Sequence, residues 1–208
     1  MILNKNTKWS IDHEHSSIHF KVKHLMFAHV IGFFKKFEAS IFLANNDFTT
    51  AEINFWVDVA SIDTGNVNRD AHLCSADFFD VVKYPQISFI SNSIGRKNEN
   101  GIHELWGALT IKGISKDVKF IVEFGGVIKD LQGNEKSGFL VDGKVNRSDW
   151  GIIFNSPLTD EGVMIGEEVT ISCEMVLLNE KSDDLKRELD FETRTNHVLK
   201  TGISDIFY

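Results

Sequence analysis

The stretch Ser17-Ile18-His19-Phe20-Lys21-Val22-Lys23 alternates strictly between apolar and polar side chains. Successive side chains on a β-strand point to opposite faces, so Ile18, Phe20 and Val22 share one face and the polar residues share the other. A helix would need apolar residues three and four positions apart. This stretch therefore predicts a half-buried strand, and it sets the pattern by which the rest of the chain is interpreted.

Seven more runs with the same period of two follow along the chain. They are short, and turn residues such as Asn45-Asn46-Asp47 and Gly125-Gly126 separate them. Because no long helical pattern lies between them, the strands are expected to pair antiparallel, as in a barrel or a sandwich. The runs cover residues 37–43, 53–59, 87–89, 105–111, 118–124, 138–146 (interrupted by Gly143) and 169–177.

Three segments depart from this alternation. Residues 24–31 are mostly apolar without a period of two, which suggests a helical turn or a lid over one end of a barrel. Residues 66–82 suggest a short helical region, with Leu73, Phe78 and Phe79 on its apolar side, that packs across a barrel mouth. After Leu178 the composition becomes charged with a weak helical spacing, so we expect a barrel domain over 1–178 and an extension over 179–208.

The composition limits the function. The 208 residues include 17 Phe, which suit either a well-filled core or a lined cavity, and the pattern alone leaves both open. A net charge of −8 disfavours nucleic-acid partners. No run of apolar residues is long enough for a membrane span. The first residues do not resemble a signal peptide, so we expect a cytoplasmic location, or a periplasmic one if a signal has been removed.

Few residues suggest chemistry. The chain lacks HExxH and GxSxG motifs, and its two cysteines, Cys74 and Cys173, are far apart, so neither a metal site nor a nucleophile is expected. His24 has the inward parity of Phe20 and reaches the cavity or is a buried neutral histidine. Arg69 and His72, beside Phe78, are candidates for contacting an anionic head group; equally, Arg69 ties its segment to neighbouring loops.

Several motifs together resemble the YceI-like family of polyisoprenoid-binding, lipocalin-like proteins. They extend from about Trp9 to Leu178, and in combination they are very specific. The matching stretches are residues 9–20, Gly32 with Phe34 and Phe37, residues 60–66, 69–73 and 77–81, Tyr84-Pro85, residues 107–113 with Val118, and residues 146–151.

The resemblance implies an all-β fold: an eight-stranded antiparallel lipocalin-like β-barrel with a short helical segment at its mouth and a C-terminal extension. It also implies a homodimer and a cavity that holds a polyisoprenoid, quinone-like or fatty-acid or fatty-amide chain, with no cofactor beyond such a lipid. Many members are exported with a signal peptide, whereas this chain shows none, and the tail after Leu178 lies outside the shared pattern.

The family has no established catalytic set to carry over, so we expect non-enzymatic binding, storage or transport of a long apolar chain. The alternative is a cyclase or isomerase that acts on a hydrophobic substrate in the same cavity through His24 or Arg69. A third interpretation is an interaction module that works through its tail. The expected cavity residues are Ile18, Phe20, Val22, His24, Phe27, Phe34, Phe37, Ile41, Phe55, Val57, Phe78, Phe89, Leu109, Ile111, Val118, Phe120, Val122, Ile171 and Met175.

Overall fold

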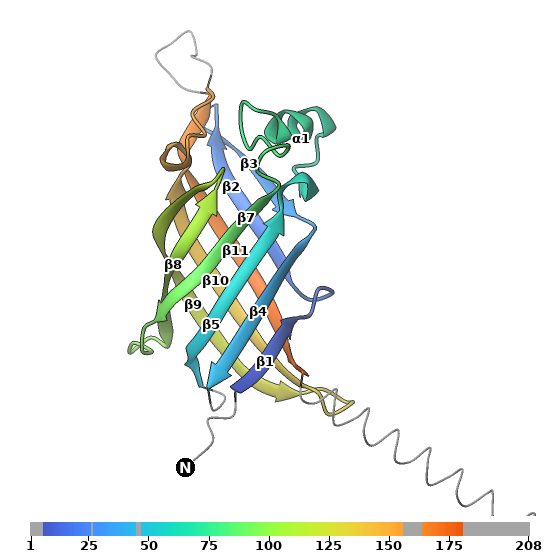
Figure 1. Ribbon diagram of the computed structural model, residues 1–208, viewed down its shortest axis with the longest axis vertical. Coiled ribbons are helices and arrows are strands. Elements are labelled where there is room, and N and C mark those ends of the chain that lie inside the picture. Colours follow the sequence, from blue (N-terminus) through green and yellow to red (C-terminus); the bar gives the residue numbers. More distant parts are fainter. Residues whose placement is uncertain (1–5, 26, 45–46, 156–163, 181–208) are drawn as a thin grey trace, which may run out of the picture.

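The computed structural model describes residues 6–25, 27–44, 47–155 and 164–180. Within these ranges the chain forms eleven strands, one α-helix and two short 3-10 helices (Figure 1). The strands are β1 (Asn6–Ile11), β2 (Ser17–His24), β3 (Ala28–Phe34), β4 (Phe37–Ala44), β5 (Asp47–Asp58), β6 (Ile62–Asp63), β7 (Gln86–Ile94), β8 (Ile102–Ile111), β9 (Ile114–Lys129), β10 (Glu135–Asn146) and β11 (Ile165–Asn179). The helices are η1 (Val59–Ser61), α1 (Val67–Cys74) and η2 (Arg147–Trp150).

Eight of these strands close into a barrel. Neighbours pair antiparallel in the order β1-β4-β5-β7-β8-β9-β10-β11, and β11 returns to β1 through the pair Trp9↔Asn179. The predicted closed, eight-stranded, antiparallel barrel with one short helix is therefore confirmed. The predicted C-terminal extension lies almost wholly outside the described residues.

The alternating stretch Ser17–Lys23 does not form one of the eight strands that close the barrel. It forms β2, which pairs with the middle of β11, whereas β1 pairs with the last residues of β11. Thus β1 and β2 share one edge of β11 as the two halves of a broken strand, and residues 12–16 form the break. The barrel still has eight strands, because β1 closes it in place of β2, which was the strand expected from the alternating sequence.

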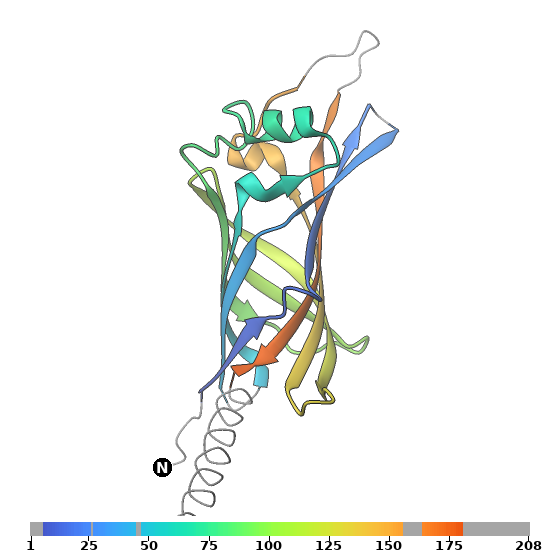
Figure 2. The ribbon, with the colours of Figure 1, turned by 90° about the vertical axis from the view of Figure 1, so that its right-hand side faces the viewer.

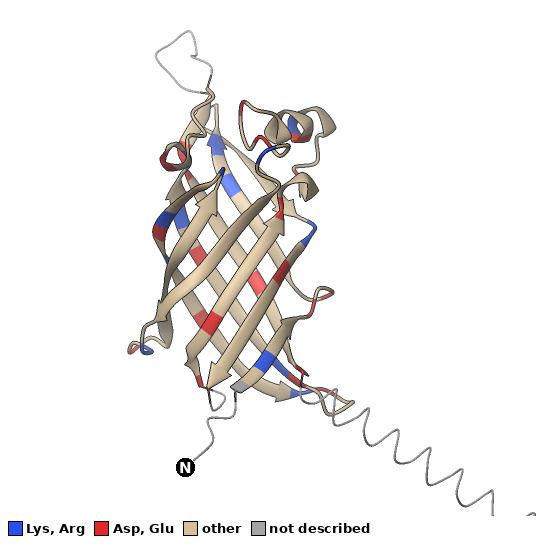
Figure 3. Ribbon diagram, in the orientation of Figure 1, with Lys and Arg blue, Asp and Glu red and all other residues tan. Residues whose placement is uncertain are grey.

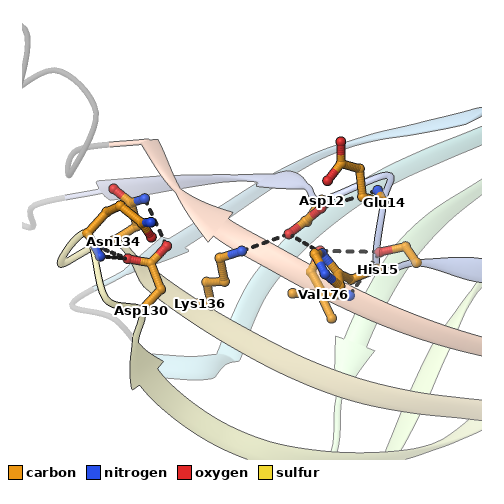
Figure 4. A network of polar contacts seen from close by, with 9 residues as sticks. Asp12, Glu14, His15, Asp130, Asn134, Lys136 and Val176 are labelled. Atoms are coloured by element: carbon orange, nitrogen blue, oxygen red, sulfur yellow. Dashed lines mark hydrogen bonds and ion pairs between the residues drawn. The ribbon is translucent and has the colours of Figure 1, made fainter.

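Asp12 fixes the corner between β1 and β2 (Figure 4). Its carboxylate Oδ2 lies 2.9 Å from His15 Nδ1 and accepts a hydrogen bond of 3.0 Å from Lys136 Nζ on β10. Burial opposes ionisation of this carboxyl, but the hydrogen bonds and charges of Lys136 and His15 outweigh that effect and lower the pKa of Asp12. An ionised Asp12 therefore holds the corner against the barrel wall.

Residues 24–31 form neither a helical turn nor a lid. They belong to a hairpin in which β2 and β3 pair from His19↔Phe33 to His24↔Ala28. The sequence concealed β3 because it is apolar on both faces: Val30, Gly32 and Phe34 face inward, while Ile31 and Phe33 are exposed. Without a polar face, a strand shows no period of two.

The end of the barrel next to this hairpin is covered by two segments, α1 with the turns that follow it and η2 with residues 151–155 (Figure 2). Helix α1 begins at the Asn66 cap, whose side-chain oxygen accepts a hydrogen bond of 3.0 Å from the Arg69 N–H. In η2, the buried Arg147 donates to the carbonyls of Ile152, Phe154 and Gly166, and so ties the segment to β11. We call this end the mouth. No helix of the described ranges is long and apolar enough to span a bilayer.

Candidate ligand cavity

The barrel encloses an apolar cavity of about 220 Å³. Side chains from every barrel strand line it, and nearly all of them are aliphatic or aromatic. On β5 its wall runs from Ala51 to Val57, and on β8 it runs from His103 to Ile111. At about 3.3 Å per residue, the β5 portion is about 20 Å long, and because barrel strands tilt by about 40° from the axis, the lined part of the lumen is about 15 Å long.

The structure places most of the expected cavity residues on this wall. They share the inward parity read from the sequence, and they come from both halves of the barrel. These residues are Ile18, Phe20, Phe34, Ile41, Phe55, Val57, Phe89, Leu109, Ile111, Phe120, Val122, Ile171 and Met175.

Six expected residues lie off the cavity wall. Val22 and His24 lie on the part of β2 that continues into the hairpin, and Phe27, at the hairpin turn, is 82% exposed. The other three, Phe37, Phe78 and Val118, pack within the barrel core or against it. These placements correct the expected set. Parity gives the face of a residue but not its height along the barrel, and Phe27 follows a turn that the sequence did not reveal.

The sequence-based set missed an aromatic group toward the end opposite the mouth. Phe48 on β5 packs against Phe124 and Phe139, with ring centroids 4.8 and 5.0 Å apart, and all three line the cavity. Phe124 and Phe139 already had inward parity in the sequence. Phe48 lies beside an Asn-Asp turn, where alternation has barely begun, so only its aromatic character signalled it.

Three phenylalanine rings lie over inward-facing glycines on neighbouring strands. A Cβ at Gly32 would come within 2.4 Å of the Phe20 ring, one at Gly107 within 2.4 Å of Phe89, and one at Gly143 within 2.3 Å of Phe120. Real Cβ atoms do not approach so closely, so each ring occupies the space that a side chain would otherwise fill. Each ring is therefore packed over the backbone of the neighbouring strand.

The lining residues with polar side chains are His19, Ser88, His103 and Cys173, and their polar atoms contribute almost nothing to the cavity surface. Burial, and to a lesser degree the charge of Asp142, raises the pKa of the Cys173 thiol to about 12, which keeps it protonated. His103 Nδ1 lies 2.9 Å from the Gly95 carbonyl oxygen. No group of three His, Cys, Asp or Glu residues in the described ranges is placed to hold a metal ion.

The two residues considered for a head group lie at the mouth, off the cavity wall. Arg69 donates from Nε to Thr64 Oγ1 at 2.7 Å and from a terminal nitrogen to the Thr64 carbonyl at 2.8 Å. His72 Nε2 lies 2.9 Å from Asp77 Oδ2, and its ring meets Phe78 and Phe154 edge-on. Both side chains thus take part in contacts that hold the mouth segments together.

Comparison with known proteins identifies the family. The model of the YceI-like domain matches residues 9–177, which is most of the chain and nearly the whole of the closed barrel. The chain belongs to the YceI-like family.

Relatives of this YceI-like chain include UPF0312 proteins of Staphylococcus epidermidis and Staphylococcus aureus. They are 42% and 38% identical to it over 164 residues, which cover 78% of this chain and 92% of each relative. Among solved structures, the YceI protein of Campylobacter jejuni is 33% identical with a TM-score of 0.65, covering 76% of this chain and 90% of that one. BcnA of Burkholderia cenocepacia is 25% identical with a TM-score of 0.67, covering 80% and 98%. A polyisoprenoid-binding domain from Saccharophagus degradans shares the fold, with a TM-score of 0.57 at 13% identity over 82% and 98% of the chains.

Proposed function

We propose that this protein binds and carries one long, slender apolar chain in its barrel cavity, without transforming it. The observation that carries this proposal is the cavity itself, whose wall is apolar along its whole length and is kept open by the paired phenylalanine rings and glycines. A narrow lumen of about 15 Å suits an extended polyisoprenoid, quinone-like or fatty-acyl chain better than a compact ring system.

The apolar wall supplies most of the binding free energy. Each buried CH₂ contributes about 0.8 kcal/mol, so a dozen carbons contribute about 10 kcal/mol before the costs of association are subtracted. When those costs are at their lower end, about 4 kcal/mol, about 6 kcal/mol remains, which corresponds to a Kd in the tens of micromolar from apolar contacts alone. The polyisoprenoid named for the Saccharophagus degradans domain, which shares this fold, supports the isoprenoid class of ligand.

The enzymatic alternative gains no support from the geometry. His24 and Arg69, the groups considered for catalysis, lie off the wall, and Arg69 is bonded to Thr64. A bound chain would meet almost only carbon, because the polar atoms of the lining histidines and of Ser88 barely reach the cavity surface and the Cys173 thiol is protonated. The test is chemical: a prenyl alcohol incubated with the protein is expected to be recovered unchanged, and conversion that depends on His24 would contradict the proposal.

Native mass spectrometry of freshly purified protein tests the binding. We expect a population heavier than the apoprotein by the mass of one lipid, and extraction should identify its chain. After delipidation, the protein should take up a fluorescent polyene fatty acid at one site, and a prenyl alcohol should displace it. A protein that is always empty and has no affinity for either probe would overturn the proposal.

The homodimer, the cytoplasmic location and the absence of nucleic-acid partners stay predictions. Light scattering of the purified chain, fractionation of the source cells and a filter-binding assay with DNA and RNA would test them in turn.

A further inference from the structure

The β2–β3 hairpin concentrates positive charge in an otherwise acidic chain. The sequence holds 30 Asp and Glu residues, yet none occurs from His15 to Phe37, where four lysines and four histidines lie. This segment forms the whole hairpin and its approaches. At the mouth end, β2 and β3 run side by side along the end of β11 and project away from the barrel to the hairpin turn (Figure 2).

The outer face of the hairpin alternates cations with apolar side chains. Lys21 lies opposite Ile31, Lys23 opposite His29, and His19 opposite Phe33. Ile31 is 58% exposed, and the Lys35 ammonium lies 5.9 Å from the centre of the Phe33 ring. Apolar side chains are normally few on the outer face of a strand. The outer face of this hairpin is therefore unusual, because it is both apolar and basic.

The tip adds a large unpacked aromatic side chain. Phe27 is 82% exposed, and its backbone N–H donates to the Leu25 carbonyl across the turn, at 2.8 Å. Exposure of a phenylalanine ring at the end of a projecting hairpin leaves most of its apolar surface in water. The ring is thus available to a surface that the barrel itself does not supply.

Lys21 and Lys23 have no ion-pair partner in the part of the chain that the structure describes. On β11, Thr170 lies opposite Lys21, and Gly166 lies against the Cβ of Lys23. The nearby carboxylates of Glu167 and Glu168 are already paired, with Arg147 at 2.9 Å and Lys144 at 2.8 Å. The blue bands on the upper part of β2 in Figure 3 mark this unneutralised charge.

We propose that the β2–β3 hairpin docks the barrel onto an anionic lipid membrane. The Phe27 ring enters the head-group region, and the ammonium groups of Lys21 and Lys23 lie against lipid phosphates. One apolar anchor plus several cations is the combination that holds peripheral proteins reversibly at bilayers. The docking stands on the hairpin alone; its use, to bring the mouth to a source of lipid, rests on the proposed function.

Vesicle co-sedimentation tests this docking. We expect the full-length protein to sediment with vesicles of phosphatidylcholine and phosphatidylglycerol, but not with phosphatidylcholine alone, and to be released by high salt. The F27S substitution should weaken binding about tenfold because it removes one phenylalanine anchor. The double substitution K21Q/K23Q should weaken it about 25-fold, at about fivefold for each lysine.

Matched controls lie at the opposite end of the barrel. L131S removes an apolar side chain at least as exposed as Phe27 from the β9–β10 hairpin, and R96Q/K97Q removes two positive charges from the β7–β8 turn. Both should bind vesicles as the wild type does. Binding that ignores phosphatidylglycerol, or hairpin variants that bind like the wild type, would overturn the proposal.

A second copy of this chain is the competing occupant. If F27S lowers the particle mass in light scattering but leaves vesicle binding unchanged, the tip belongs to an interface between copies and membrane docking is refuted. Uptake of the fluorescent fatty acid from solution separates this result from the proposed function. All hairpin variants should bind that probe normally, since Phe27, Lys21 and Lys23 lie off the cavity wall.

Discussion

Replacement of Gly143 by alanine should narrow the cavity without opening the barrel. The new Cβ would lie 2.3 Å from Phe120 Cδ1, and relief to an ordinary contact of 3.4 Å requires the ring to move by about 1 Å. The sheet blocks outward movement, so the ring moves into the lumen that it now borders. Overpacking of this kind costs about 1–3 kcal/mol of stability.

The substitution should weaken ligand binding because the Phe120 ring takes space that the ligand would occupy. A ring that moves inward takes the room of about two CH₂ groups of the ligand, or about 1.6 kcal/mol, which is about a fifteenfold rise in Kd. Titration with the fluorescent polyene fatty acid measures this change. Gly138→Ala, on the same strand, is the matched control because nothing lies within 4 Å of its new Cβ, and it should bind like the wild type.

A second substitution separates narrowing from general damage. Phe120→Leu in the Gly143→Ala background removes the ring that was pushed inward, so affinity should recover. If Gly143→Ala is folded and binds the probe as tightly as Gly138→Ala, the bound chain does not pass Phe120, and the account of an open lumen kept by paired rings and glycines is wrong.

Three further results are expected. Asp12→Asn should lower the free energy of unfolding at pH 7 by about 1–3 kcal/mol, because the charged hydrogen bond to Lys136 is lost. The pKa of Asp12 in the folded protein lies below its ordinary 3.8, so the stability advantage of the wild type in urea unfolding should shrink as the pH falls below about 4. A difference in stability that stays constant with pH would refute the assignment. Cys173, with a pKa of about 12, should resist iodoacetamide at pH 8 in the folded protein and react after unfolding, as mass spectrometry of the alkylated peptide would show; rapid labelling of the folded state would contradict its placement. Trp9→Phe should destabilise less than Trp150→Phe in thermal unfolding, since the Trp9 indole N–H has no acceptor in the described structure whereas that of Trp150 donates to a backbone carbonyl at 3.2 Å; the reverse order would refute this comparison.

Alternation predicted the barrel well because one face of most strands meets water. Where neither face of a strand is polar, or where an apolar residue lies in a turn, the sequence pattern does not predict the structure. β3 is apolar on both faces, and Phe27 reads as core although it lies at a turn. The sequence also did not predict that β1 and β2 are two halves of a broken strand. Alternation shows which face of a strand is buried, but it does not show which part of β11 the strand pairs with.

Whether the interior is filled or hollow was beyond the sequence for a different reason. Gly143 reads as an interruption of a strand, and its role depends on the orientation of the Phe120 ring on the neighbouring strand. A contact of this kind joins residues that are distant in the chain, so no local pattern encodes it. The phenylalanine count raised the question of a cavity, and only the packing of the rings answered it.

The two ends of the barrel sequence meet in space. Trp9 pairs with Asn179, and the Lys8 ammonium lies 2.9 Å from the Glu180 carboxylate. The barrel is therefore closed by non-covalent contacts between its first and last strands, and its closure does not depend on where the chain begins. A circular permutant that joins these ends by a short linker and begins in the exposed turn at Leu131 should fold to the same barrel, with its mouth and hairpin unchanged.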